Sequence, residues 1–220
     1  MTGPLRHFPD DLLRGFAVGA ASEGATLAVA CHLALCPTCR DGAAAHESAL
    51  DVLLRTSETA GEAPPPALRD RLLSDLPPPA PPPPARTPKP LPADMPALPP
   101  ALVNRLGGLD QVSWRTLVPG IRAIDLGIAS AWRARLLCFR PGILIPAHDH
   151  GGAEHTVVFS GGLDDAEGHL GRGDAATMTP GNAHRQHSSP GEPCVALIVN
   201  EGPALPKSPF GHFMKWVTRS

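Results

Sequence analysis

The run PPPAPPPP, residues 77–84, decides how this chain of 220 residues is organised. Sixteen of the 28 prolines fall within residues 61–100. Proline has no backbone N–H and a fixed φ, so such a tract cannot join a helix or a sheet and favours extended polyproline II. It is typical of a semi-rigid spacer. The sequence therefore predicts a smaller N-terminal module and a larger C-terminal one, joined by this spacer.

The first 60 residues favour helix, because they are rich in Ala and Leu and poor in β-branched residues. The triplet Pro9–Asp11 is typical of a helix start. Ser22 is a suitable cap for a second helix reaching about Leu35, and Pro37 for the first turn of a third helix ending near Ser57. So small a bundle buries little apolar surface, and we expect it to need a metal ion, a partner or both.

Beyond the spacer the pattern changes to short strands. Val112–Val118, Trp132–Phe139 and Cys194–Val199 are apolar or alternating runs, separated by turn signals such as Pro119-Gly120 and Pro141-Gly142. Many short strands with closely spaced turn signals indicate a β-sandwich or β-barrel. The C-terminal half is therefore predicted to be all-β.

A first set of candidate metal ligands lies in the helical module, as His32-x₃-Cys36-x₂-Cys39. His32 and Cys36, four residues apart, share one helix face, and Cys39 falls in the first turn of the next helix. Such soft ligands suit tetrahedral zinc, which needs a fourth ligand. We expect His7 in that place, with His46 as the competitor two helical turns beyond Cys39. A redox dithiol of Cys36 and Cys39 is the alternative.

A second set lies in the β-rich half, as His148-x-His150-x₃-Glu154 followed thirty residues later by His184. His148 and His150 point the same way on a strand, and a glycine pair lets the chain turn so that Glu154 reaches the same centre. His184 is expected from a strand across the barrel, with His187 as its substitute. Three imidazoles and a carboxylate suit zinc, iron, manganese or nickel. The alternative is a loop of surface histidines.

Charge and hydropathy exclude several classes of protein. With 19 Lys and Arg against 21 Asp and Glu, the net charge of −2 leaves no basic excess to neutralise a phosphate backbone, so we expect no direct nucleic-acid partner. No apolar run reaches the roughly 18–20 residues that cross a bilayer, and the N-terminus lacks the plan of a secretion signal. We expect a cytoplasmic protein with no membrane contact.

Both ligand sets resemble known families. His148, His150 and Glu154 are similar to the first motif of the cupin β-barrel, and the stretch from Gly173 through Thr179-Pro180-Gly181 to His184 is similar to the second. His7, His32, Cys36 and Cys39 resemble the zinc-binding anti-sigma domain, in which an upstream histidine joins H-x₃-C-x₂-C. In this order the two domains resemble the ChrR-type anti-sigma factors.

The resemblance implies an α+β multidomain protein. It would have a zinc-binding anti-sigma helical domain over residues 1–76, a Pro-rich linker over 77–100 and a cupin (jelly-roll) β-barrel sensor domain over 101–220. It implies a structural Zn²⁺ in the first domain and a second divalent metal ion, for which we expect Zn²⁺, in the cupin.

The resemblance also implies a function. The N-terminal domain would sequester an extracytoplasmic-function-type sigma factor in a 1:1 complex, and the cupin would trigger release under oxidative stress, from singlet oxygen or organic peroxide. The segment Ala67–Leu76 carries leucines on one face and is expected to dock on the sigma factor, or else to pack on its own bundle. We do not expect this protein to be an enzyme. The alternative is a cupin metalloenzyme, a dioxygenase or isomerase, with a regulatory zinc-binding N-terminal domain.

Overall fold

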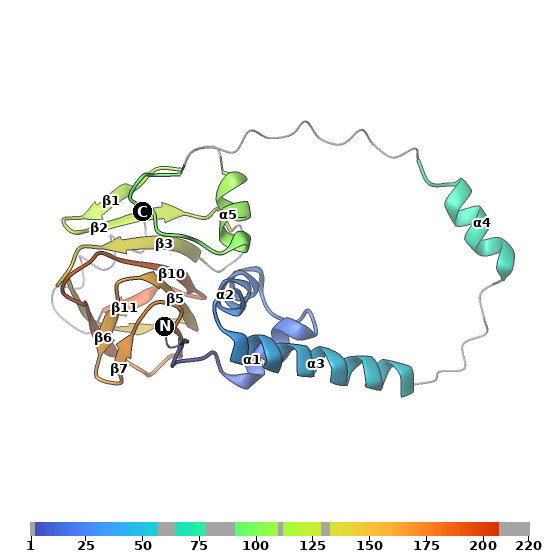
Figure 1. Cartoon of the computed structure of the whole chain (residues 1–220), viewed down its shortest axis with the longest axis horizontal. Coiled ribbons are helices and arrows are strands. Elements are labelled where there is room, and N and C mark those ends of the chain that lie inside the picture. Colours follow the sequence, from blue (N-terminus) through green and yellow to red (C-terminus); the bar gives the residue numbers. More distant parts are fainter. Residues whose placement is uncertain (1–2, 57–64, 78–90, 110–111, 129–132, 207–220) are drawn as a thin grey trace.

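A computed structural model describes residues 3–56, 65–77, 91–109, 112–128 and 133–206 (Figure 1). Five helices in this part precede its strands: α1 (Asp10–Ala17), α2 (Glu23–Leu33), α3 (Pro37–Thr56), α4 (Pro66–Ser74) and α5 (Pro100–Gly107). The expected order of helices first and strands after is confirmed. The proline tract beyond Pro77, the predicted end of the third helix at Ser57 and the predicted strand start at Trp132 lie outside the described residues.

The predicted helix starts are confirmed. Pro9 precedes α1, the Ser22 side chain accepts a hydrogen bond from the backbone N–H of Ala25 at 3.1 Å, and α3 begins at Pro37. Helix α5 was not predicted, although Pro100 at its first position is a usual helix start. None of the described helices is both long and apolar enough to cross a membrane.

The strands form two antiparallel sheets. One has six strands in the order β1 (Arg115–Val118), β2 (Ile121–Asp125), β3 (Arg133–Phe139), β10 (Cys194–Asn200), β5 (Glu154–Ser160) and β8 (Ala175–Met178). The other has five, in the order β11 (Ala204–Pro206), β4 (Leu144–His150), β9 (His184–Ser188), β6 (Leu163–Asp165) and β7 (Gly168–Leu170). Neighbours distant in sequence, such as β3, β10 and β5, are typical of a jelly roll, so the predicted fold class is confirmed.

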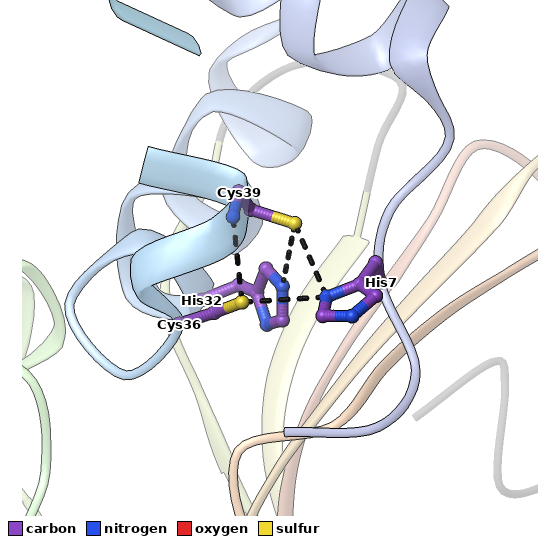
Figure 2. Close-up of side chains that lie close together, drawn as sticks. All are labelled: His7, His32, Cys36 and Cys39. Atoms are coloured by element: carbon purple, nitrogen blue, oxygen red, sulfur yellow. Dashed lines mark hydrogen bonds between the residues drawn. The ribbon is translucent and has the colours of Figure 1, made fainter. Parts of the chain in front are cut away.

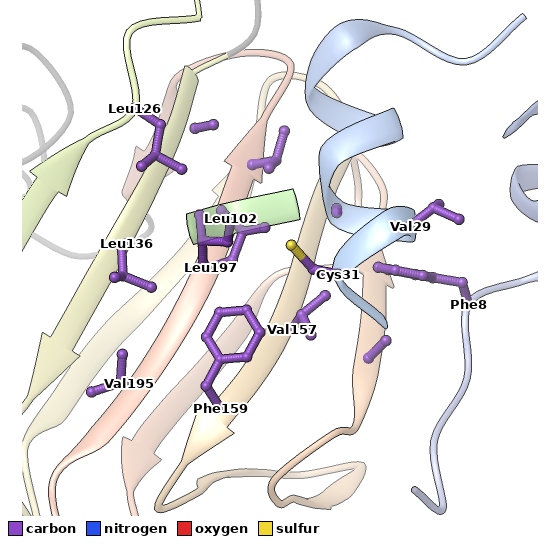
Figure 3. Close-up of a cluster of buried hydrophobic side chains, with 14 of the residues drawn as sticks. Phe8, Val29, Cys31, Leu102, Leu126, Leu136, Val157, Phe159, Val195 and Leu197 are labelled. Atoms are coloured by element: carbon purple, nitrogen blue, oxygen red, sulfur yellow. The ribbon is translucent and has the colours of Figure 1, made fainter. Parts of the chain in front are cut away.

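The six-stranded sheet is buried on both of its faces. Along β5, Val158 belongs to the apolar cluster between the sheets, whereas Val157 and Phe159 belong to a second cluster shared with the helices. Figure 3 shows Phe8, Val29 and Cys31 of the N-terminal part in that second cluster, beside strand residues such as Val157. Burial on both faces explains why β10 is apolar almost throughout.

The N-terminal helices are therefore not a separate bundle. Helix α2 contacts β5, β10 and α5, and its Ala28, Val29 and Cys31 are fully buried. The outer face of the six-stranded sheet covers the apolar side chains that so small a bundle could not bury by itself.

The described end of the predicted linker also packs against the strands. Asp94 accepts a hydrogen bond from the Arg122 guanidinium at 2.7 Å and another from the Trp114 indole at 3.0 Å. Met95 and Leu98 pack against the shared core. The domain boundaries at 76/77 and 100/101 remain predictions.

Candidate metal centres

The structure brings the four predicted ligands of the helical part together (Figure 2). Their donor atoms all lie within 4.8 Å of one another. The His32 Nε2 lies 3.2 Å from the Cys39 Sγ, and the His7 Nδ1 lies 3.3 Å from the Cys36 Sγ and 3.4 Å from the Cys39 Sγ. We call this group, His7, His32, Cys36 and Cys39, the first centre.

Local structure accounts for three of these positions. His32 lies in the last turn of α2, and its backbone carbonyl accepts a hydrogen bond from the Cys36 N–H at 2.8 Å. Pro37 then begins α3, so that Cys39 falls in its first turn. His7 comes from the segment before α1. The competitor His46 is held elsewhere, with its Nε2 2.8 Å from a carboxylate oxygen of Asp10.

The donor set of the first centre fits a divalent metal ion. An ion bound at roughly 2.0–2.3 Å in a tetrahedron separates its nitrogen and sulfur ligands by about 3.5 Å, close to the distances found. Burial lowers the pKa of His32 to about 4, which leaves its imidazole neutral at pH 7. Burial and the neighbouring Cys36 raise the pKa of the Cys39 thiol to about 11. A cation is what would favour the thiolate there.

The four predicted ligands of the β-rich part also converge. His148, His150, Glu154 and His184 offer ligand atoms within 4.8 Å of one another, and we call this group the second centre. The Nε2 atoms of His148 and His184 are 3.2 Å apart, and the His150 Nδ1 lies 3.6 Å from a Glu154 oxygen. His184 lies opposite His148 on the neighbouring strand β9, so the expectation that it comes from across the barrel is wrong.

The turn between β4 and β5 needs its glycines because another loop passes close by. A Cβ atom on Gly152 would lie 2.5 Å from the Cβ of Glu201. The chain reverses within three residues after His150, and β5 starts at Glu154. The predicted role of the glycine pair in turning the chain stays a prediction, since what the structure shows is the close approach of the neighbouring loop.

Burial sets the charge state of the second centre. It lowers the pKa of His148, and it lowers the pKa values of His150 and His184 to about 4, so all three imidazoles are neutral at pH 7. Burial also raises the pKa of Glu154 to about 7. The hydrogen bond that Asn200 Nδ2 donates to this carboxyl group at 2.5 Å acts in the opposite direction and lowers the pKa. The buried His150 Nε2 and His184 Nδ1 have no hydrogen-bond partner among the described residues.

The spare histidines lie outside the second centre. His187 is exposed and its Nε2 lies 3.8 Å from an Asp164 oxygen. His155 faces the other side of the sheet, where its Nδ1 lies 3.0 Å from the Thr177 hydroxyl. The two centres are thus the candidate metal-binding groups that the sequence predicts.

Two supporting residues were missed in the sequence. Asp149 accepts hydrogen bonds from the backbone N–H groups of Gly181 at 2.9 Å and His150 at 2.8 Å, and so ties the two motifs together. Its place between two candidate ligands was the available signal. Asn200 has no such signal, because only strand pairing sets it opposite Glu154.

The chain is similar to known proteins over most of its length. Residues 104–204 match the ChrR cupin-like domain family. Anti-sigma-E factor ChrR of Cereibacter sphaeroides is 32% identical over 208 residues, which cover 90% of each protein. In the crystal structure of Rhodobacter sphaeroides SigE in complex with the anti-sigma ChrR, the matching chain has a TM-score of 0.70 and 31% identity, over 89% of the present chain and 98% of that chain.

Proposed function

Because the chain belongs to the ChrR family of anti-sigma factors, we propose that it holds an extracytoplasmic-function-type sigma factor inactive in a 1:1 complex. The observation that carries this proposal is the similarity over 90% of both proteins, which spans helices and cupin-like sandwich together. Its role is regulatory and not enzymatic. An anti-sigma factor meets its partner where transcription takes place, so we place it in the cytoplasm.

Exposed leucines support a protein partner for the helices. Val52, Leu53 and Leu54 near the end of α3 are each more than half exposed, at 58%, 64% and 65%. Helix α4 exposes Leu68, Leu72 and Leu73, and Leu76 just after it is exposed too, which disfavours packing of this segment on its own bundle. Apolar side chains on two helices suit a groove of a partner protein. We place the sigma factor on these helices.

The first centre is proposed to bind a structural zinc ion. Two thiols and two imidazoles satisfy the four positions that a structural zinc site fills with protein ligands. Zinc would then fix His7 ahead of α1 to the α2–α3 junction, and so hold all three helices in one arrangement.

The second centre is proposed to bind a divalent metal ion, zinc in the first instance, and to be the part that responds to an oxidant. Four protein ligands converge there. A cupin metalloenzyme would need an open metal position for its substrate, which this ligand count disfavours.

Co-expression tests the proposal. The chain is expressed with each extracytoplasmic-function-type sigma factor of its own genome, starting with any encoded beside it, and the products are analysed by size exclusion with light scattering and by elemental analysis. We expect one sigma factor to co-purify at 1:1, with about two metal ions per chain. A matched chain carrying Leu53→Asp and Leu72→Asp should lose the complex but keep its metals. A wild-type chain that binds none of these sigma factors would contradict the proposal.

A further inference from the structure

The segment just before the ligand His7 lies against the cupin-like sandwich. Strand β8 is an edge of the six-stranded sheet, and the backbone N–H of Ala175 at its start donates to the carbonyl of Arg6 at 3.1 Å. An unpaired sheet edge is thereby covered by the N-terminal segment. The turn Gly171–Asp174, which joins β7 to β8, supplies further contacts.

Asp174 fixes the backbone ahead of His7. One oxygen of its buried carboxylate accepts hydrogen bonds from the backbone N–H groups of Leu5 at 2.7 Å and Arg6 at 3.1 Å. The other oxygen accepts from the N–H of Gly171 at 2.8 Å and so rigidifies the turn itself. Hydrogen bonds to an ionised carboxylate are among the stronger ones in proteins. They hold in place a short segment that has no helix or strand of its own.

Gly173 acts on the second histidine of the first centre. Its carbonyl lies 2.9 Å from the His32 Nδ1. Because a carbonyl only accepts, Nδ1 carries the proton, and the lone pair of His32 is on Nε2, which faces the Cys39 Sγ at 3.2 Å. Only glycine suits this position, since its φ is +92° and a Cβ would lie 2.9 Å from the Pro4 Cγ.

We propose that Gly173 and Asp174 are positioning residues of the first centre, so that a turn of the cupin-like domain sets the metal affinity of the N-terminal helices. Gly173 fixes the tautomer and ring direction of His32, and Asp174 holds the segment that carries His7. Cys36 lies in the junction between α2 and α3, and Cys39 lies in the first turn of α3. The inference rests on metal binding at the first centre, as proposed above, and goes beyond it by making that centre depend on both parts of the chain.

The test is a titration of the full-length, metal-free chain with Co²⁺. Charge-transfer bands between thiolate and cobalt report the first centre alone, because the second has no sulfur ligand. Asp174→Ala should lower the affinity read from these bands by about 10–100-fold, the usual cost of removing a group that orients a ligand. The visible ligand-field bands should shift, because His7 is no longer held at the metal.

Two further variants separate positioning from general damage. Asp174→Asn keeps one oxygen for the N–H groups of Leu5 and Arg6 and should recover most of the affinity. Glu167→Gln removes the exposed ion pair at 2.9 Å between Glu167 and the same Arg6, and should match the wild type. An Asp174→Ala chain with native circular dichroism, wild-type cobalt affinity and wild-type bands would overturn the inference.

Two variants of Leu5, whose N–H donates to Asp174, test the inference even if Asp174→Ala fails to fold. Leu5 is exposed at 80%, so neither variant removes a side chain from the sandwich. Leu5→Pro removes the N–H that donates to Asp174 and also fixes φ at residue 5, whereas Leu5→Ala keeps that donor. Leu5→Pro should weaken cobalt binding and Leu5→Ala should not. Equal affinities for the pair contradict the inference, whereas a wild-type chain without thiolate–cobalt bands contradicts the first centre itself, and the inference with it.

Discussion

Glu154 and His155 are neighbours on β5 and face opposite sides of the six-stranded sheet. Glu154 belongs to the second centre inside the sandwich, whereas the ring of His155 meets the ring of Phe8 edge-on, with centroids 5.8 Å apart. Phe8 in turn lies edge-on to His32, at 5.3 Å. A ligand of one centre is therefore joined to a ligand of the other through one strand position and one phenylalanine, although the two ligand sets are far apart in the sequence.

Phe8→Ala is expected to destabilise the whole chain. Phe8 is 4% exposed and packs between the two histidine rings, so truncation leaves a cavity between the helices and the sheet, at a cost of about 3–5 kcal/mol. Denaturant unfolding followed by circular dichroism measures this. Val18→Ala, at an exposed position of the same helical part, serves as the control and should cost much less. If Phe8→Ala lowers the free energy of unfolding by less than about 1 kcal/mol, the packing of Phe8 between the histidine rings is not part of the core.

Histidine variants of the first centre distinguish its fourth ligand. His7→Ala should lower zinc affinity, measured by competition with a chromophoric chelator, because one ligand is lost and water must replace it. His46→Ala removes only the contact with Asp10 and should bind zinc like the wild type. The reverse order of the two affinities would show that the metal-bound arrangement uses His46.

Two histidine variants identify the ligand of the second centre in the same way. His184→Ala should lose the metal ion of the second centre and keep that of the first, because His184 lies among the ligands and its neighbours hold their places. His187→Ala, three residues along the same strand, removes an exposed ring and should keep both metal ions. Elemental analysis of the purified variants gives the count. Metal loss in His187→Ala alone would reassign the ligand.

The sequence predicted well those features of the two centres that depend on local backbone structure. Pro37 starts α3 and so places Cys39 in its first turn, and strand alternation aligns His148 with His150. Such spacings depend only on backbone geometry, so one sequence is enough to read them. The predicted helix face shared by His32 and Cys36 is wrong, because α2 ends at Leu33 and Cys36 lies in the junction before α3.

What the sequence did not predict depends on contacts between distant segments. The apolar face of α2, with Val29 and Cys31, looks the same whether it meets its own bundle or a sheet. The positions of Asn200 and Asp174 follow from strand pairing and from a turn that meets the N-terminus. The proline tract suggested separation because it limits local structure, but it says nothing of how the flanking parts pack.

Acid should weaken the contact between Asp94 and the sandwich. The hydrogen bond from Arg122 holds the pKa of Asp94 below its usual value of 3.8. A carboxylate with a lowered pKa in the folded state stabilises the fold above its unfolded pKa, and this contribution is lost as pH falls through the folded one. Asp94→Asn should therefore cost up to about 1 kcal/mol at pH 7, since the pair is partly exposed.

Stability curves against pH measure this contribution. The difference between the wild type and Asp94→Asn should shrink below about pH 4, where the Asp94 carboxyl of the unfolded chain takes up a proton before that of the folded chain. Asp51→Asn, in the exposed pair with Arg55 on α3, is the control for a surface ion pair. A difference that grows with acidity would contradict the assigned sign.

A fragment ending at Asp75 tests how far the helices act alone. It keeps the four ligands of the first centre and most of the exposed leucines of α3 and α4, so it should still bind and inhibit the sigma factor. It loses Gly173, Asp174 and the sheet that covers Val29 and Cys31. We therefore expect weaker zinc binding and aggregation in the absence of the sigma factor, and no response to oxidant.

A sigma-dependent reporter compares the fragment with the full chain and with His148→Ala, Glu154→Ala and His184→Ala, each with and without oxidant. Constitutive inhibition by the fragment and by all three variants is expected, because the second centre lies in the part removed or altered. An oxidant response that persists in the three variants would move the sensor to the thiols of Cys36 and Cys39. Loss of inhibition by a fragment that still binds zinc would mean that the cupin-like domain itself helps to hold the sigma factor. Such a result is conceivable because α2 packs against the sheet of that domain.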